Sequence, residues 1–111
     1  MKSKVNGCAS KLPRVYAEKA ARIIKTVSHE FGFTETLLWG GSRVPIHCLA
    51  RWVCWRFMLE AGLSMKMIAG YTGHDPSSVY YGVRRLKEDM GNQRVVVEMV
   101  QAVELGLNAN E

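Results

Sequence analysis

The segment Ser64–Lys87, SMKMIAGYTGHDPSSVYYGVRRLK, constrains the fold of this chain more than any other stretch. Ser64 is a favoured N-cap residue, so a short helix is expected to begin directly after it. Leu63 and Ile68 have the spacing of a hydrophobic staple, which determines how the chain enters that helix. These two signals together predict a capped helix at the start of the segment.

A tight connection and a second helix are predicted next. Gly70 and Gly73 bracket a short connection that can adopt positive φ. Asp75-Pro76 then restarts the helix, because Asp caps free N–H groups and Pro at the first helical position has a preset φ. The interpretation is a helix-turn-helix over about residues 64–89.

The second helix of this pair has two different faces. Its buried stripe is predicted from apolar residues at positions i, i+4, i+7 and i+11, which are Val79, Val83, Leu86 and Met90. The opposite face carries Ser77, Tyr81, Arg84, Arg85 and Glu88. Small polar groups at a helix start, followed by arginines, suit a DNA major groove. Plain helical packing with a solvated arginine face is the alternative for this segment alone.

The rest of the chain is also predicted to be helical. One helix covers residues 13–31 and stops at Gly32, and a short helix capped by Thr34 follows. Residues 45–61 are apolar almost all round, which is typical of a central helix packed on several sides. A last amphipathic helix around residues 95–107 closes the core or forms a dimer seam. We therefore expect one compact all-α domain of five to six helices over residues 13–111, after a flexible basic arm over residues 1–12.

Arginines outside the helix-turn-helix are candidates for contacts with a polyanion. Arg43 lies in the Gly40–Pro45 loop, where an arginine is either solvated or able to enter a minor groove. Arg51 and Arg56 are candidate phosphate contacts because they precede the helix-turn-helix closely. Each is also four residues from a tryptophan, although helix packing is the preferred role of both tryptophans.

The distribution of charge supports a polyanionic partner. The net charge is +5 in 111 residues, with seven basic residues and one acidic residue in 1–25 and seven basic residues against two acidic ones in 43–87. The C-terminal residues 88–111 hold five acidic residues and one basic residue. Positive charge thus collects at the N-terminus and around the helix-turn-helix, as expected of a protein that binds nucleic acid.

The sequence indicates little chemistry beyond binding. The three cysteines form no C-x-x-C motif and the three histidines are far apart, so we predict no metal site and reduced thiols. Neither a catalytic constellation nor a cofactor loop is apparent, so we predict no enzyme, no cofactor and no small-molecule substrate. An apolar run of membrane-spanning length and a signal peptide are also absent from the sequence, so we expect no membrane partner and a cytoplasmic protein.

One motif in the helix-turn-helix resembles a known family. The run Gly73-His74-Asp75-Pro76-Ser77-Ser78-Val79 is similar to the Gly-Arg-Asp-His-Thr-Thr-Val run of the C-terminal DNA-binding domain (domain IV) of the bacterial chromosomal replication initiator DnaA. Ser64-Met65 stands where that family has Ser-Leu, and Arg43 falls in its basic loop. Over about residues 23–90 the order of elements also resembles this Trp-repressor-like domain. The resemblance implies a DnaA domain IV-like fold.

The resemblance also implies roles for individual residues. Asp75, Pro76, Ser77 and Ser78 would face base edges in the major groove, and Arg43 would enter the adjacent minor groove. The DNA backbone would be contacted by Arg51, Tyr81 and Arg85, with Arg56, Lys66, His74 and Arg84 as further candidates. Asp75 has a competing or additional role as a plain N-cap, since a carboxylate has several acceptor sites.

Two departures from the family motif affect the expected function. Pro76 replaces a histidine and His74 replaces an arginine, so a side-chain donor and a fixed positive charge are missing. The chain also lacks a Walker-type loop, so it resembles a stand-alone domain of phage or bacterial origin rather than a whole initiator. The first hypothesis is a sequence-specific double-stranded DNA-binding protein that regulates replication initiation or transcription. The alternative is a protein-interaction module that modulates a replication initiator or another regulatory protein without base readout.

Overall fold

Residues 12–109 are described in the computed structural model, and they form six helices and no strand. In chain order these are α2 (Arg14–Phe31), α3 (Glu35–Trp39), α4 (Pro45–Glu60), α5 (Met65–Thr72), α6 (Pro76–Asn92) and α7 (Arg94–Ala109). The prediction of an all-α domain is confirmed. The predicted arm, residues 1–12, lies outside the described residues except for Leu12, which packs against the core.

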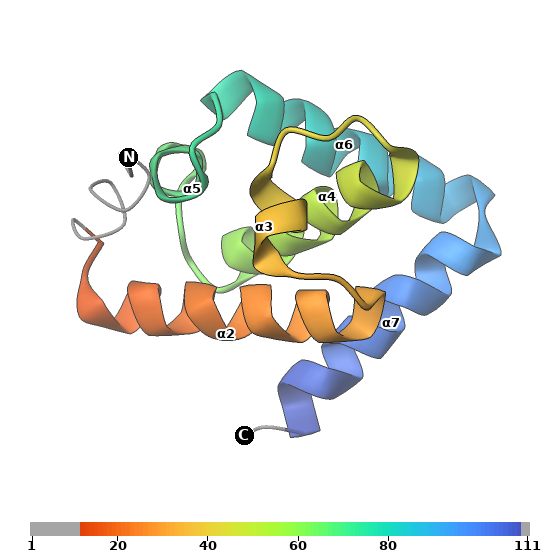
Figure 1. The fold of residues 1–111 in the computed structure, drawn as a ribbon, viewed down its shortest axis with the longest axis horizontal. Coiled ribbons are helices and arrows are strands. Elements are labelled where there is room, and N and C mark those ends of the chain that lie inside the picture. The colour runs from red at the N-terminus through yellow and green to blue at the C-terminus, as the bar shows by residue number, and fades with distance from the viewer. Residues whose placement is uncertain (1–11, 110–111) are drawn as a thin grey trace.

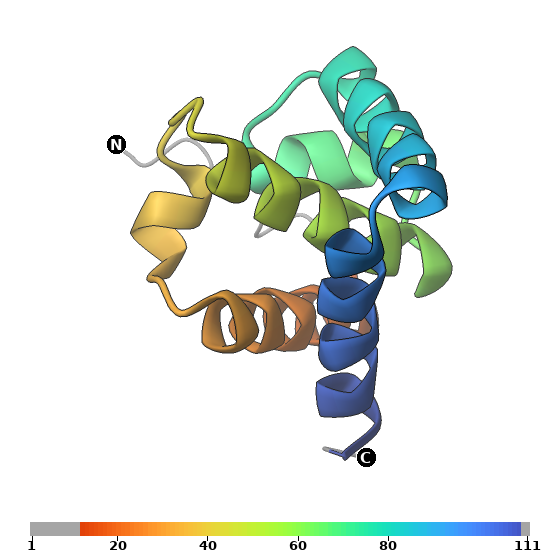
Figure 2. The ribbon, with the colours of Figure 1, turned by 90° about the vertical axis from the view of Figure 1, so that its right-hand side faces the viewer.

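The central helix is α4. It contacts α2, α3, α5 and α6, and the α5–α6 pair lies on the side opposite α2 (Figure 1). Figure 2 shows α7 running down from the end of α6 to cross α2. Six apolar residues of α4 are buried, in agreement with its apolar pattern: Ala50, Val53, Cys54, Trp55, Phe57 and Met58. Both segments of the predicted helix-turn-helix are therefore mounted on one buried helix.

Local signals account for most helix ends. Gly32 adopts a left-handed conformation (φ 79°) directly after α2, as expected of a C-terminal glycine. The Thr34 side chain accepts a hydrogen bond from the Leu37 N–H at the start of α3. Ser64 does the same for the Met67 N–H at the start of α5. The predicted caps at Thr34 and Ser64 are confirmed.

The turn between α5 and α6 is shorter than predicted. Gly70 does not open the connection, because α5 continues through Thr72 and only Gly73 takes positive φ (76°). Thr72 is buried; its hydroxyl donates to the Ile68 carbonyl oxygen and accepts from the Trp55 indole N–H at 3.3 Å. This contact with α4 stabilises the last turn of α5, so tertiary packing outweighs the glycine signal.

The buried stripe of α6 is rotated slightly from the predicted one. Val79, Gly82 and Leu86 are buried, whereas Val83 and Met90 are half-buried. Gly82 packs directly on α4, and a Cβ there would lie 2.3 Å from the Trp52 Cδ1. Only a residue without a side chain allows the two helices to approach this closely.

The last helix closes the core. Val96, Val100 and Val103 of α7 are buried, and α7 contacts both α2 and α6. Within residues 12–109, no helix has the length and apolar character needed to cross a membrane. The same residues contain no group of three His, Cys, Asp or Glu side chains placed to hold a metal ion.

Candidate nucleic-acid interface

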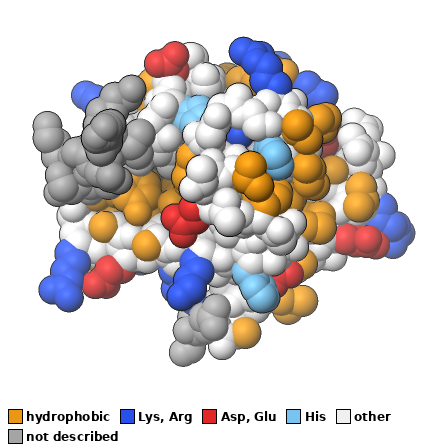
Figure 3. Space-filling view, in the orientation of Figure 1, with side chains coloured by type: hydrophobic (Ala, Val, Ile, Leu, Met, Phe, Trp, Pro, Cys, Tyr) orange, Lys and Arg blue, Asp and Glu red, His pale blue; other side chains and the backbone are white. Residues whose placement is uncertain are grey.

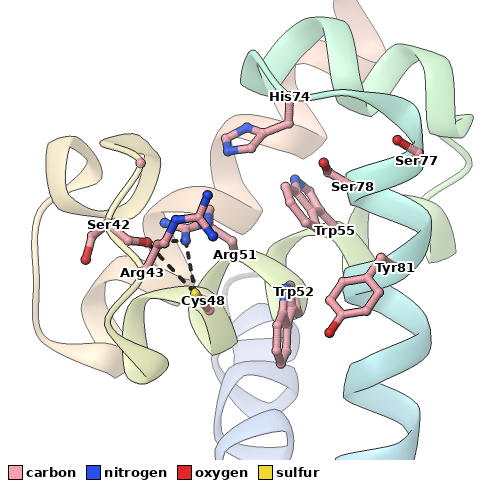
Figure 4. A pocket seen from close by; sticks show the side chains of 11 residues that line it. Ser42, Arg43, Cys48, Arg51, Trp52, Trp55, His74, Ser77, Ser78 and Tyr81 are labelled. Carbon is pink, nitrogen blue, oxygen red and sulfur yellow. Dashed lines mark hydrogen bonds between the residues drawn. The ribbon is translucent and has the colours of Figure 1, made fainter.

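A hollow of about 560 Å³ opens between the loop that follows α3, helix α4 and the start of α6 (Figure 4). Its lining includes six residues that the sequence singled out: Arg43, Arg51, His74, Ser77, Ser78 and Tyr81. They come from three segments that are distant in the sequence. The fold therefore places the predicted minor-groove residue and the predicted major-groove helix on the two sides of one hollow.

The loop over residues 40–44 is held to α4 by Arg51. The Arg51 side chain is only 7% exposed, and it donates to the carbonyl oxygens of Leu38 at 3.0 Å and Ser42 at 2.5 Å. Its Nη2 also lies 3.2 Å from the Cys48 Sγ (Figure 4). The structure gives Arg51 a buried hydrogen-bonding role, whereas the sequence made it a candidate for a phosphate contact.

Ser42 is the second anchor of this loop, and it was not among the residues predicted from the sequence. Its hydroxyl accepts from the Val44 N–H at 3.1 Å and is 2.9 Å from the His47 Nδ1. A serine two residues before a helix N-cap is a local signal of such a turn, although short side chains of this kind occur in many loops. Arg43, next to Ser42, is exposed. Its side chain is thus presented by a loop whose backbone is fixed on both sides.

The start of α6 presents polar groups to solvent. Asp75 occupies the N-cap position and Pro76 the first helical position, as predicted. Among the described residues, however, the Asp75 carboxylate makes no capping hydrogen bond, so the simple capping role is wrong. Asp75, Pro76, Ser77 and Ser78 are all exposed. The carboxylate and two hydroxyls therefore remain available to an external ligand.

His74 packs in an aromatic cluster beneath the turn. Its ring lies 5.2 Å from the Trp55 ring and 5.9 Å from the Trp39 ring, both edge to face. Nδ1 is 2.9 Å from the Thr72 carbonyl oxygen, so Nδ1 carries the hydrogen and donates. Burial, together with the positive charge of Arg51, lowers the pKa of His74 despite the Thr72 bond and the Asp75 charge. A neutral, half-buried imidazole is a poor phosphate contact, which argues against the backbone-binding role predicted for His74.

Tyr81, Arg85 and Trp52 form a cluster at the edge of the hollow. Arg85 Nη1 donates to the Tyr81 hydroxyl at 3.1 Å, and its guanidinium carbon lies 5.9 Å above the Trp52 ring. Trp52 and Tyr81 also meet edge to face at 6.4 Å. The cation over Trp52 thus comes from α6. The arginine–tryptophan pairs noted in the sequence, four residues apart, both lie within α4. Arg85 is held over Trp52 by these contacts and by Asp89, 3.6 Å away, and it borders a neighbouring hollow rather than this one.

Three other predicted contacts lie away from this hollow. Arg56 pairs with Glu60 at 3.1 Å, and Arg84 lies 3.7 Å from Glu88. These two arginines border a second hollow of about 540 Å³ between the end of α4, the start of α5 and α6. Lys66 is exposed on α5. Figure 3 shows Lys and Arg side chains in several separate places on this face, some of them along the upper edge over α6.

The combined surface has the chemistry of a binding site. It offers hydroxyl donors and acceptors, a carboxylate acceptor and an apolar proline at the start of α6, with exposed Arg43 across the hollow and exposed Arg84 and Arg85 further along α6. A comparison of the chain with protein-family models finds no match, and no curated protein matches it either.

Proposed function

We propose that this protein binds double-stranded DNA sequence-specifically, with the start of α6 in the major groove and Arg43 in the adjacent minor groove. One observation carries the proposal: exposed Arg43 and the exposed residues Ser77 and Ser78 flank the same hollow. A DNA strand separates a minor groove from the neighbouring major groove, so a reader of both grooves needs two such elements with a gap between them.

The side chains at the start of α6 suit base edges. The Asp75 carboxylate can accept from cytosine N4, and the hydroxyls of Ser77 and Ser78 can meet either bases or phosphates. Pro76 offers an apolar surface for a thymine methyl group. An arginine such as Arg43 favours a narrow minor groove, where the negative potential is enhanced. These contacts together would select a sequence.

Exposed cations would position the protein on the duplex. Arg84 and Arg85 each have a carboxylate one turn later, in Glu88 and Asp89. Ion pairs at a protein surface add little stability, so a phosphate can replace the carboxylate. Lys66 and Tyr81 are further backbone contacts in this arrangement. The affinity is therefore expected to fall as salt rises.

The proposed role is regulatory and requires no catalysis. Occupation of a chromosomal site would control replication initiation or transcription. In this role the protein would act in the cytoplasm of a bacterial or phage-infected cell.

The test begins with selection from a random-sequence duplex library, followed by fluorescence anisotropy with the selected duplex, an initiator-type box and a scrambled duplex. Across a salt series, we expect the selected duplex to bind at least about a thousandfold tighter than the scrambled one. Arg43→Ala should reduce this preference. Equal binding to selected and scrambled duplexes at every salt concentration would refute the proposed base readout.

One observation favours a protein-interaction module as the second candidate. Tyr80 is 57% exposed beside the second hollow, whose lining also includes Leu59, Met65 and Val83. An exposed aromatic residue next to apolar side chains is typical of a protein contact. Binding to a replication initiator or another regulatory protein, without any duplex preference, would support this candidate over the first.

A further inference from the structure

We propose that Arg51 is a positioning residue, which holds the Arg43 loop in the conformation that enters a minor groove. The inference rests on the proposed DNA-binding function for the identity of the ligand. It assigns to Arg51 a part in specificity without any contact between Arg51 and DNA.

The geometry of the Arg51 guanidinium carries the proposal. Nη1 donates to the Leu38 carbonyl oxygen in the last turn of α3, and Nη2 donates to the Ser42 carbonyl oxygen directly before Arg43 (Figure 4). One rigid planar group thus joins α3, the loop and α4. A lysine ammonium is a compact point charge on a flexible stem and does not reproduce this fork.

The loop needs such an anchor because its own backbone is permissive. Gly40 and Gly41 precede Ser42, and Gly41 has a positive φ of 81°. Glycine populates both signs of φ readily, so the segment has many accessible conformations when it is not tied down. Hydrogen bonds from a charged donor to carbonyl oxygens are stronger than neutral ones. Arg51 therefore selects one loop conformation and with it one position of the Arg43 backbone.

The same geometry argues against a phosphate contact by Arg51. Although it borders the hollow, its side chain is 7% exposed and its two Nη atoms point to carbonyl oxygens and the Cys48 sulfur. Arg43, Arg84 and Arg85, in contrast, are all exposed. A phosphate meets these side chains at much lower desolvation cost.

The experiment is a double-mutant cycle with duplexes that present the same major-groove edges but different minor-groove edges. Inosine in place of guanine removes the N2 amino group from the minor groove and leaves the major-groove O6 and N7 unchanged. We would measure the affinity ratio between I·C and G·C versions of the selected site for the wild type, Arg43→Ala, Arg51→Lys and the double variant. The salt dependence of each is recorded in parallel.

We expect the wild type to prefer the I·C duplex by about tenfold, the size of one good groove contact. Arg51→Lys should lose that preference as Arg43→Ala does, and the double variant should be no worse than Arg43→Ala. The salt slope of Arg51→Lys should equal that of the wild type. Arg51→Met should also keep this slope, because no phosphate contact is lost. Additive losses in the cycle, or a salt slope lowered by about 0.9 in Arg51→Met, would overturn the proposal in favour of a phosphate contact.

A second variant and a second measurement keep the test decisive if Arg51 variants fold poorly. Ser42→Ala loosens the same loop through Val44 and His47 and leaves every charge in place. The Ser42 carbonyl oxygen still accepts from Arg51 in this variant, so the I·C preference should be reduced by less than in Arg51→Lys, with an unchanged salt slope. An unchanged preference would contradict the dependence of the Arg43 contact on the conformation of this loop. If the wild type binds the selected and scrambled duplexes equally, the proposed function fails. Amide hydrogen exchange of residues 42–44 then decides alone, and equal exchange in wild type and Arg51→Lys would refute the anchor.

Discussion

Gly82 of α6 sits against the Trp52 indole of α4, so closely that a Cβ on Gly82 would lie 2.3 Å from Cδ1 and 2.8 Å from Nε1. Trp55 closes the other side, with its Cζ3 at 2.8 Å from the same point. Both rings belong to the helix that also carries Arg51. The contact therefore determines the distance between the exposed helix α6 and the Arg43 loop.

Gly82→Ala is expected to destabilise the fold by about 1–3 kcal/mol, because the methyl group forces two tryptophans to move. The measurement is urea unfolding. Gly91→Ala is the matched control in the same helix, since among the described residues no atom lies within 4 Å of a Cβ there. Alanine at that position should stabilise the helix by up to about 1 kcal/mol. If Gly82→Ala leaves the free energy of unfolding unchanged, the interface between α4 and α6 has room for a methyl group at this position.

Thr72→Val should cost about 1–3 kcal/mol of unfolding free energy, because the Trp55 indole N–H loses its partner in a buried environment. The substitution keeps the shape and β-branching of the side chain. Thr36→Val, on the exposed surface of α3, is the control and should change stability by less than about 0.5 kcal/mol. If Thr72→Val and Thr36→Val change the free energy of unfolding equally, the buried hydrogen bond does not stabilise α5.

The free energy of unfolding is expected to decrease as the pH falls, because His74 becomes protonated. Burial lowers the pKa of His74 below its ordinary value of 6.5, so the unfolded chain binds the proton more readily than the native protein. This contribution is complete above about pH 6.5 and is lost as the pH drops through 6.5 toward the lower native pKa. Urea unfolding between pH 5 and 8 should show a weaker dependence in His74→Gln than in the wild type. A pH dependence in His74→Gln equal to that of the wild type would contradict this contribution.

Ser77→Ala and Ser78→Ala are expected to weaken binding to the selected duplex by about five- to tenfold, at the lower end of the cost of one lost base contact. Binding to a scrambled duplex should not change. Gln101→Ala, an exposed polar truncation on α7, is the control. Equal loss on both duplexes in anisotropy titrations would assign these hydroxyls to phosphates rather than bases.

Arg85→Ala should weaken binding to selected and scrambled duplexes by similar factors, since a phosphate contact carries no sequence information. The slope of log affinity against log salt should decrease in magnitude by about 0.9, the value for one phosphate. Glu98→Ala, on the exposed surface of α7, provides a control that changes the net charge and leaves α6 unaltered. A loss confined to the selected duplex would place Arg85 on a base edge instead.

The elements of this fold were predictable because their signals are local. Ser64 and Thr34 act as caps within three residues of their partners, and the apolar pattern of residues 45–61 identified the central helix. The helical continuation through Gly70 was missed because it depends on Thr72 meeting Trp55, seventeen residues earlier in the chain.

The candidate site was predictable in its position but less so in the roles of its residues. Local spacing identified Asp75–Ser78 as a helix start and Arg43 as a loop residue. The role of Arg51 depends on carbonyl oxygens nine and thirteen residues away, and that of His74 on burial between two tryptophans. Such contacts arise only once the helices pack, so neither spacing nor charge distribution reveals them.

The Arg43 loop and α6 are both attached to α4. The separation between these two DNA-contacting elements is therefore fixed by the fold. For a duplex partner, this means that the minor-groove and major-groove determinants must be separated by a constant number of base pairs. A single inserted base pair would shift one determinant by about 3.4 Å along the duplex and rotate it around the duplex axis. That determinant would then be out of reach of the Arg43 loop or of α6. The recognition sequence would then be one uninterrupted block of invariant length.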